Sequence, residues 1–428
     1  MKNFWRYLLL AVVLFVGALV FIVARNWDTV SLAWENASAM TEGSEEARTI
    51  EKPADLAAYL SRHPKSASLV VVSGDGTIQH AHRATSQQPL YRLPHLLLLA
   101  TAAERMYDGR LDSTEQVPIE AMEAFALPGL TDAAHTEMVD SLRAQNVVRD
   151  EAIPLVEVVR GMMTYQSTAA ADWLMTRLGQ ETVAELPEAY GLTGSDAPRP
   201  MSGTYVAWLR ARNASPDSLR IEPRLGMTPK AYADTVWGAT SRLASDPSFR
   251  EALVSPLTEQ GTGLSVIQQR DLASATFPRG TALDYGRLLA QIYAGGPGAP
   301  ELGTAPVGSG WREMQMLIET PLRQAAAPEN SARLDSIRGR NVPSTVSLAN
   351  VAGAYPGLLT LGGYARSDTS EARIVALMMH DLPVAVFYQL AQTGIDKGLF
   401  LELLVDTSAP ERIVRQIQGS QIQGETAR

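Results

Sequence analysis

The sequence contains no cysteine. Disulfides, thiolate nucleophiles and cysteine-based metal sites are therefore excluded. Lysine is also scarce, because the 37 basic residues include only Lys2, Lys52, Lys65, Lys230 and Lys397. A catalytic amine therefore has few possible sources. The net charge of −9 argues against a nucleic-acid-binding surface, which requires a basic patch, so no nucleic-acid partner is expected.

The longest apolar run lies at the N-terminus. Residues 7–24 form eighteen consecutive uncharged positions, preceded by Lys2 and Arg6. A helix of that length spans about 27 Å, close to the thickness of a membrane hydrocarbon core. A cleaved signal peptide is the alternative, but the nearby Ala-x-Ala at 37–39 lies too far from the run. Residues 1–27 are therefore predicted to anchor the chain in the cytoplasmic membrane, with the N-terminus in the cytoplasm and the main domain outside it.

The rest of the chain divides into three parts by composition. Residues 28–53 are polar and acidic without an apolar period, which is typical of a linker. Residues 54–410 carry the apolar segments of one folded domain, and residues 411–428 are expected to form a polar tail.

The periodicity of the domain indicates an α+β fold. An apolar strand, a Gly-Asp-Gly turn and an alternating strand predict a hairpin over 68–83, and two further strands are expected at 357–366 and 372–380. Residues 113–240 have a helical pattern interrupted by prolines, and an apolar helix is expected over 94–106. Strands at both ends of the domain, with helices between them, predict one antiparallel sheet and an all-helical lobe.

The order of several segments resembles the serine β-lactamase and penicillin-binding-protein superfamily, in particular the class A-like serine hydrolases. The resemblance is carried by "PLYRLPHLLLLATAAERMYDGRLD", "IPLVEVVRGMMTYQSTAAADWLMTRLG" and "VAGAYPGLLTLGGYAR", among other segments between residues 54 and 405. It implies the α+β β-lactamase fold described above.

Members of this superfamily carry Ser-x-x-Lys at the start of a buried central helix. The helix N-terminus supplies N–H groups for an oxyanion, and the lysine one turn later accepts the serine proton. The resemblance places Arg92 at the serine position and His95 at the lysine position. Arg92 is a permanent cation and cannot act as a nucleophile. His95 is able to act as a base, but no hydroxyl stands at the expected place for it to activate.

The other two family motifs are also altered. The Ser-x-Asn motif of a helix–helix loop falls on Gln166 and Thr168, and the Lys-Thr-Gly motif of an inner strand falls on Val351, Ala352 and Gly353. An aliphatic side chain thus replaces the cation that would hold a substrate carboxylate, and only the glycine remains. None of the five lysines follows a serine by three positions, so the chain contains no Ser-x-x-Lys at all.

No catalytic residue is therefore assigned, and several interpretations stay open. Arg92 and His95 either form a polar helix end or bind an anion or peptide, with catalysis through His95 as a third option. Ser167 is either a helix cap or a nucleophile, and Tyr165 either packs between helices or forms a cleft wall. The predicted ligand cleft consists of Arg92, His95, Tyr165, Gln166, Thr168 and Ala352.

The remaining histidines give no sign of a metal site or cofactor. His80 and His82 lie two apart on a predicted strand, but no third ligand is evident, so both are expected to face solvent. His135 follows a loop-like stretch and has no evident partner.

The favoured hypothesis is a membrane-anchored, catalytically inactive member of the superfamily outside the cytoplasmic membrane. Its cleft would bind or regulate a cell-wall peptide or an envelope protein. Loss of the serine nucleophile of another hydrolase costs about 10⁶-fold in turnover, or about 8 kcal/mol of barrier. The alternative is an active hydrolase of the β-lactamase/D-Ala-D-Ala peptidase class that cleaves amide or ester bonds with an altered apparatus. A purely structural envelope protein is a third possibility.

Overall fold

The structure is a computed structural model that describes residue 32 and residues 35–214, 226–294, 346–367 and 372–425. The predicted membrane anchor at 1–27 lies outside these residues. Among the residues described, none of the helices is long and apolar enough to span a bilayer.

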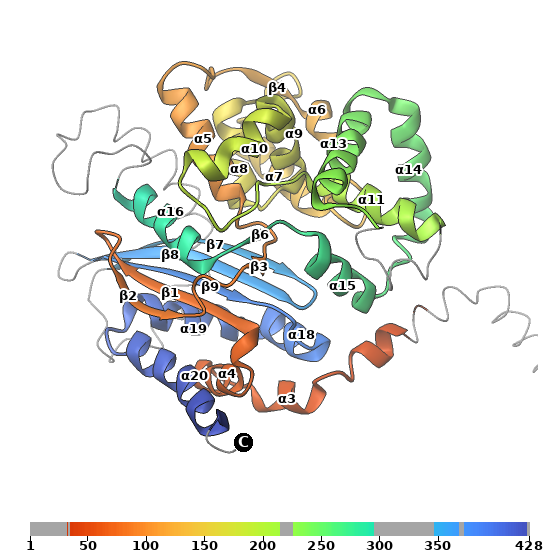
Figure 1. The fold of residues 1–428 in the computed structure, drawn as a ribbon. Helices are drawn as coiled ribbons and strands as arrows, with labels where there is room; N and C mark the ends of the chain where they lie inside the picture. Colours follow the sequence, from red (N-terminus) through yellow and green to blue (C-terminus); the bar gives the residue numbers. More distant parts are fainter. Residues whose placement is uncertain (1–31, 33–34, 215–225, 295–345, 368–371, 426–428) are drawn as a thin grey trace, which may run out of the picture.

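One five-stranded antiparallel sheet forms the centre of the molecule, as the α+β pattern predicted (Figure 1). Its order is β2-β1-β9-β8-β7, so the first two strands of the domain pair with the last three. The strands are β1 (Ala67–Ser73), β2 (Ile78–His82), β7 (Val346–Tyr355), β8 (Leu358–Ser367) and β9 (Arg373–Met379). In the register, Leu69 of β1 and Leu361 of β8 both lie opposite Leu377 of β9. The predicted hairpin and both predicted C-terminal strands are confirmed.

Both faces of the sheet are covered, which explains why β1 is apolar at nearly every position. Successive side chains of a strand point to opposite faces. Val70 and Val72 accordingly join the core shared with the helical lobe, whereas Leu69 and Val71 join a second core on the other face. Burial of both faces favours a continuous apolar run over an alternating one.

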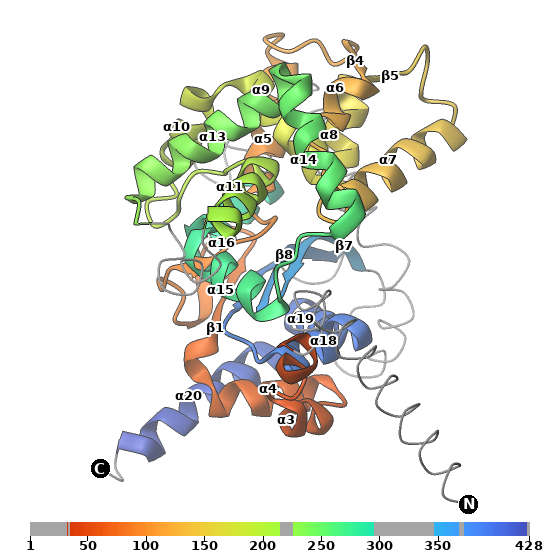
Figure 2. The same cartoon turned by 90° about the vertical axis from the view of Figure 1, so that its right-hand side faces the viewer.

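Among the described residues, helices from both ends of the domain cover the face of the second core (Figures 1 and 2). Three of them follow β9 along the chain, and two precede β1. They are α18 (Val384–Thr393), α19 (Ile395–Val405), α20 (Ala409–Glu425), α3 (Ser44–Thr49) and α4 (Pro53–Arg62). A single 3-10 turn, Pro64–Ser66, connects α4 to β1.

The other face carries α16 and the helical lobe. Helix α16 (Ala282–Ala294) packs on β1, β8 and β9. The lobe contains α5 (His95–Tyr107), α6 (Ile119–Glu123), α7 (Asp132–Ala144), α8 (Leu155–Thr164), α9 (Thr168–Leu178), α10 (Gln180–Ala189), α11 (Met201–Ala214), α13 (Pro229–Ser245), α14 (Pro247–Gln260) and α15 (Val266–Thr276). Two short ribbons complete it: β3 (Gln88–Pro89) with β6 (Arg279–Gly280), and β4 (Gln116–Pro118) with β5 (Ala152–Pro154).

Helix α5 is the buried axis of the lobe. The residues from Leu96 to Ala100 have no exposed surface, and the helix packs against α8, α9 and α10. A helix surrounded by other elements needs apolar side chains on every side, which explains its uncharged run. The helix predicted over 94–106 is confirmed.

The acidic segment at 28–53 differs from the linker expected from its composition. Its last part folds as α3, which packs against α18, and Ile50 is fully buried. Glu42 forms an ion pair with Arg270, whose Nη1 lies 2.7 Å from a carboxylate oxygen. A few well-placed apolar and charged residues therefore attach this segment to the domain, although its average composition is polar.

The polar tail expected at 411–428 also differs from the structure. Helix α20 continues as far as residue 425, and Ile413 and Ile417 are buried against the second core. Gln418 donates a hydrogen bond to the carbonyl of Ala81, 3.0 Å away. Apolar residues four positions apart lie on one face of a helix. The two isoleucines have this spacing, but the polar residues around them dominate the average composition of the segment.

Candidate functional site

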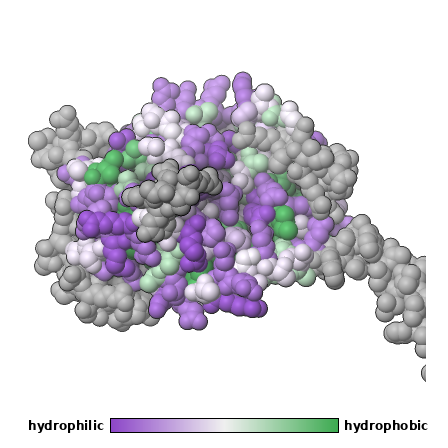
Figure 3. Space-filling model, turned by 60° about the horizontal axis from the view of Figure 1, so that its bottom comes forward, coloured by the Kyte–Doolittle hydropathy of each residue, from purple (hydrophilic) through white to green (hydrophobic). Residues whose placement is uncertain are grey.

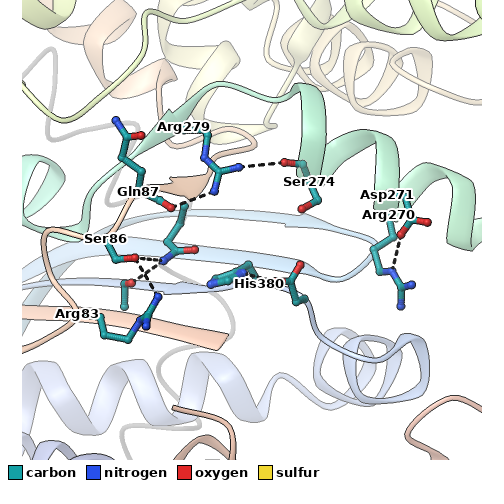
Figure 4. A network of polar contacts seen from close by, with 11 residues as sticks. Arg83, Ser86, Gln87, Arg270, Asp271, Ser274, Arg279 and His380 are labelled. Atoms are coloured by element: carbon teal, nitrogen blue, oxygen red, sulfur yellow. Dashed lines mark hydrogen bonds and ion pairs between the residues drawn. The ribbon is translucent and has the colours of Figure 1, made fainter. Parts of the chain in front are cut away.

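The short ribbon of β3 and β6 precedes α5, and hydrogen bonds attach it to the neighbouring elements (Figure 4). Arg279 donates to the carbonyl of Ser274 in α15 at 3.2 Å and to the carbonyl of Gln87 at 3.1 Å. Arg83 donates to Ser86 at 3.0 Å. These bonds fix β3 against β6 and α15, and so fix the position of the residues that follow β3.

Arg92 lies at the N-terminal entrance of α5 and reaches across to the α8–α9 loop. Its Nη1 donates to Oε1 of Gln166 at 2.5 Å, and its guanidinium lies 4.7 Å from the centre of the Tyr91 ring. The first and second motif positions predicted from the sequence are therefore in direct contact. The Nε of Arg92 is buried and has no hydrogen-bond partner among the described residues.

Strand β7 brings the third motif to the same place. A side chain at Gly353 would lie 2.8 Å from Oγ1 of Thr360 and 3.1 Å from the backbone nitrogen of Arg92. Glycine thus permits close approach of the strand to the start of α5. Val351 points to the same face and is buried in the core of the helical lobe.

Ala352 differs from its predicted place in the cleft. Its side chain packs against the second core, on the face of the sheet opposite Arg92. The cause is the alternation of side chains along a strand: because Val351 and Gly353 face α5, the residue between them faces away.

The α8–α9 loop presents Gln166 in an unusual backbone conformation. Its φ of 58° lies in the left-handed region, which non-glycine residues seldom adopt. Thr168 begins α9, is fully buried, and has an Oγ1 without a hydrogen-bond partner in the described chain. Tyr165 directs its hydroxyl to Oγ of Ser141 in α7 at 2.5 Å. Tyr165, at the end of α8, therefore contacts the neighbouring helix α7.

Ser167 caps α9 and has a histidine as its neighbour. Its Oγ accepts a hydrogen bond from the backbone N–H of Ala170 at 3.2 Å and lies 3.4 Å from Nδ1 of His135. Ser167 has no exposed surface, and His135 is 3 % exposed. Burial lowers the pKa of His135 to about 4, so its ring is neutral near pH 7. His135 belongs to α7, and not to a loop as its sequence context suggested.

His95 is buried in the first turn of α5. Its side chain is 3 % exposed, and burial, together with the charge of Arg92, lowers its pKa to about 3. The ring is therefore neutral and well shielded from water. Within the described parts of the chain, no hydroxyl forms a hydrogen bond with it.

Five aromatic side chains pack beside Arg92 and Gly353. Tyr355 lies two residues beyond Gly353 on β7, and its ring centre is 5.2 Å from that of Tyr91 and 5.1 Å from that of Phe277. Helix α11 adds Tyr205 and Trp208, with ring centres 6.4 and 6.1 Å from Tyr355. All five rings are buried. We call this set, Tyr91, Tyr205, Trp208, Phe277 and Tyr355, the aromatic cluster.

A buried carboxylate holds α11 in place. Asp172 of α9 accepts hydrogen bonds from the backbone N–H groups of Met201 at 2.9 Å and Ser202 at 2.6 Å, at the start of α11. Burial raises the pKa of Asp172 to about 7, although these bonds act in the opposite direction. Neither Asp172 nor the aromatic cluster was predicted from the sequence.

The two histidines of β2 differ from the expectation that both face solvent. His80 is half-buried, whereas His82 is buried with its Nε2 2.8 Å from the carbonyl of Pro64. The 3-10 turn before β1 covers this end of the strand and provides that acceptor. No group of three or more His, Asp or Glu side chains suited to a metal occurs in the described residues.

The sequence matches the family model of the beta-lactamase enzyme family over residues 53–295. The chain belongs to the beta-lactamase enzyme family. The resemblance drawn from the motif segments is thereby confirmed. A search of curated proteins finds no match.

Solved structures of similar proteins include a β-lactamase from Sphaerobacter thermophilus, with 13 % identity, a TM-score of 0.46, and coverage of 81 % of this chain and 95 % of that one. A class A β-lactamase of the last common ancestor of Gram-negative bacteria has 12 % identity and a TM-score of 0.46, with 82 % and 97 % covered. An acyl-enzyme complex of PBP-A with penicillin G has 12 % identity and a TM-score of 0.45, with 88 % and 96 % covered.

Proposed function

We propose that this member of the beta-lactamase enzyme family is non-catalytic, and that its altered cleft serves as a binding or regulatory surface. The observation that carries the proposal is the hydrogen bond between Arg92 and Gln166. A permanent cation, bonded across to the neighbouring loop, occupies the place where the family resemblance puts the nucleophilic serine. Its guanidinium has no lone pair with which to attack a carbonyl.

The surroundings of Arg92 support the same conclusion. His95 is a neutral, buried imidazole without a hydroxyl to activate. Val351 leaves β7 without the cation expected to hold a substrate carboxylate. The aromatic cluster fills the side of β7 next to Gly353 with the protein's own rings.

The chain's N-terminal sequence supports a location outside the cytoplasmic membrane. The uncharged run at 7–24 follows two basic residues, which favours a retained single-pass anchor with a cytoplasmic N-terminus. A protein held there would meet cell-wall peptides and envelope proteins, and we propose these as the partners of the cleft. Arg92 provides a fixed positive charge for a peptide carboxylate.

Acylation by a β-lactam tests the absence of catalysis. The purified full-length chain, incubated with a fluorescent penicillin, should show no covalent adduct by intact-mass spectrometry, while a class A β-lactamase treated in parallel is labelled. Stoichiometric labelling of any hydroxyl side chain would contradict the proposal.

Binding to the cleft needs a separate measurement. Titration with soluble cell-wall peptides should give saturable binding that Arg92→Ala weakens. Arg143→Ala is a matched control, because Arg143 is exposed and pairs with Glu151 on the surface of the lobe. Equal affinities of the two variants would exclude Arg92 from the binding surface.

One observation favours a second candidate function, a hydrolase that uses Ser167 and His135. Their 3.4 Å separation is close to that of a nucleophile and its general base. Against it, both side chains are buried, and the serine hydroxyl already accepts the capping bond. This candidate predicts turnover of a chromogenic cephalosporin or an aryl ester that His135→Ala abolishes.

A further inference from the structure

Arg92 is a partly buried cation without a counter-charge in the described chain. Among these residues its guanidinium forms one hydrogen bond, to the amide oxygen of Gln166, and no carboxylate lies within ion-pair distance of it. A guanidinium has five N–H donors, so this bond uses only a small part of its capacity. Withdrawing a charge from water is costly unless an opposite charge pairs with it. Arg92 is therefore suited to an anion that comes from outside the chain.

Two other arginines show the more usual arrangement. Arg270 is also partly buried, and its Nη1 lies 2.7 Å from a carboxylate oxygen of Glu42. Figure 3 shows the side of the molecule bearing α4, α19 and α20 as largely hydrophilic, with small, separate apolar areas. There Arg412 pairs with Glu402 at 3.6 Å. The chain itself neutralises these two cations, and it does not neutralise Arg92.

Two polar groups beside the contact of Arg92 with Gln166 lack an acceptor in the described chain. They are the Nε of Arg92 and the Oγ1 of Thr168, which are both buried without a hydrogen-bond partner. Arg92 stands at the entrance of α5 and Thr168 at the start of α9, so these groups belong to the two elements that the contact joins. Both groups are able to donate, and an ionised carboxylate accepts only. The unsatisfied groups therefore favour an anionic acceptor as the ligand.

Gln166 gives Arg92 a neutral substitute for such an acceptor. An amide presents one oxygen, whereas a carboxylate presents two that match the guanidinium fork and form charge-assisted bonds about twice as strong. The Tyr91 ring, 4.7 Å from the guanidinium, gives Arg92 a second contact that does not involve Gln166. A ligand carboxylate can therefore take the place of the Gln166 amide while Arg92 stays where it is.

The backbone of Gln166 has a conformation typical of switch regions. Its φ of 58° lies in the left-handed region, and residues held in this way cluster at ligand clamps and switches. The bond to Arg92 is made by the end of the Gln166 side chain. Rotation of that side chain releases the guanidinium and requires no movement of α8 or α9.

We propose that the hydrogen bond between Arg92 and Gln166 is an autoinhibitory contact, which a ligand carboxylate displaces when it binds to Arg92. This inference rests on the function proposed above and adds how access to the cleft is regulated. Gln166 lowers the apparent affinity for a carboxylate, because only the molecules in which Arg92 is released are able to bind it. Removal of the Gln166 contact should therefore tighten binding, whereas removal of Arg92 should weaken it.

Calorimetric titration of the full-length chain with N-acetylglycine measures both effects. This probe carries the terminal carboxylate of a peptide, and N-acetylglycinamide is its neutral analogue. The informative variant is Gln166→Asn, because asparagine adopts the left-handed conformation readily and its side chain is one methylene too short to keep the bond. The variant should bind N-acetylglycine about tenfold or more tightly than the native chain does. Neither protein should bind N-acetylglycinamide.

Two further variants serve as controls. Gln180→Asn is matched in chemistry, because Gln180 is exposed, lies beyond the other end of α9 and donates to Asp234 at 3.3 Å. Its affinity for N-acetylglycine should equal that of the native chain. The double variant of Arg92→Ala with Gln166→Asn should bind as weakly as Arg92→Ala alone, because the contact acts only through Arg92.

Three results would overturn the inference. Equal affinities of Gln166→Asn and Gln180→Asn, with binding that Arg92→Ala still weakens, would exclude the autoinhibitory contact and leave the proposed binding function intact. Absence of saturable binding to Gln166→Asn at up to about 10 mM N-acetylglycine would exclude a carboxylate site at Arg92 altogether. Equal binding of N-acetylglycinamide and N-acetylglycine would show that the carboxylate is not the group recognised.

Discussion

The carboxylate that holds α11 gives a pH-dependent prediction for Asp172→Asn. The pKa of Asp172 is raised by burial from its usual 3.8 to about 7. Below about pH 3, the group is largely protonated in the folded and unfolded chain alike. As the pH rises towards 7, the unfolded chain releases this proton while the folded chain retains it, so folding becomes progressively less favourable. Above pH 7 the loss is complete, at about 4 kcal/mol.

Asparagine does not titrate, so the variant does not lose folding free energy in this way as the pH rises. Its single carbonyl oxygen replaces two oxygens that accept from Met201 and Ser202, which costs about 1 kcal/mol at all pH values. The variant should therefore be slightly less stable than the native chain near pH 3 and more stable near pH 8. Urea unfolding followed by tryptophan fluorescence at a series of pH values measures the difference.

Asp246→Asn is the matched control. Asp246 is an exposed cap of α14, and hydrogen bonds from the backbone N–H of Phe249 and from Arg242 lower its pKa. The stabilisation that these bonds give to the ionised carboxylate is fully present above the usual pKa of an aspartate. It is lost as the pH falls through the lowered pKa of the folded chain. This control should be less stable than the native chain by a constant amount between pH 5 and 8, so that its stability profile runs parallel to the native one. Parallel stability profiles for Asp172→Asn and the native chain would refute the reasoning about the buried carboxylate.

Three further predictions concern the packing and chemistry of the lobe. Gly203→Ala should lower the melting temperature sharply, because the new Cβ would lie 2.2 Å from a backbone carbonyl of α13. Gly238→Ala has open space around it and should raise the free energy of unfolding by up to about 1 kcal/mol. Equal melting temperatures of the two variants would contradict the close packing of α11 and α13. The double change Arg92→Ser with His95→Lys should leave the chain without penicillin acylation in intact-mass spectrometry, because Val351 and the aromatic cluster remain. Ser167→Ala should reduce the free energy of unfolding by about 1 kcal/mol in urea titrations through loss of the cap of α9, with ester turnover unchanged from background.

The parts of the fold that could be predicted are those encoded by local patterns. The hairpin of β1 and β2 follows from an apolar run, a glycine turn and an alternating strand, and α5 follows from a long uncharged run. Composition averaged over a window was less informative. The segment before Pro53 and the one after Ala409 both look polar, yet the first buries Ile50 and the second buries Ile413 and Ile417, which attach each segment to the domain.

The candidate site was predictable only where a family motif marked the position. Arg92, Gln166 and Gly353 are far apart in sequence, and their meeting followed from the resemblance. Ser167 and His135 are 32 residues apart, and nothing in the sequence around either residue predicts their contact. The aromatic cluster likewise depends on how α11 packs, and nothing in the periodicity of that helix indicates the direction in which its rings point.

The stability of the fold and the chemistry at the entrance of α5 depend on different residues. Leucines 96 to 99 are fully buried, and burial of each contributes about 1.5–3 kcal/mol. That contribution comes from the apolar body of α5 and is independent of the residue at its entrance. The approach of β7 to α5 depends on the missing side chain of Gly353, which is retained. The residue at this meeting point of three elements can therefore vary without loss of the fold, and Gln166 provides the polar partner that the partly buried guanidinium of Arg92 requires.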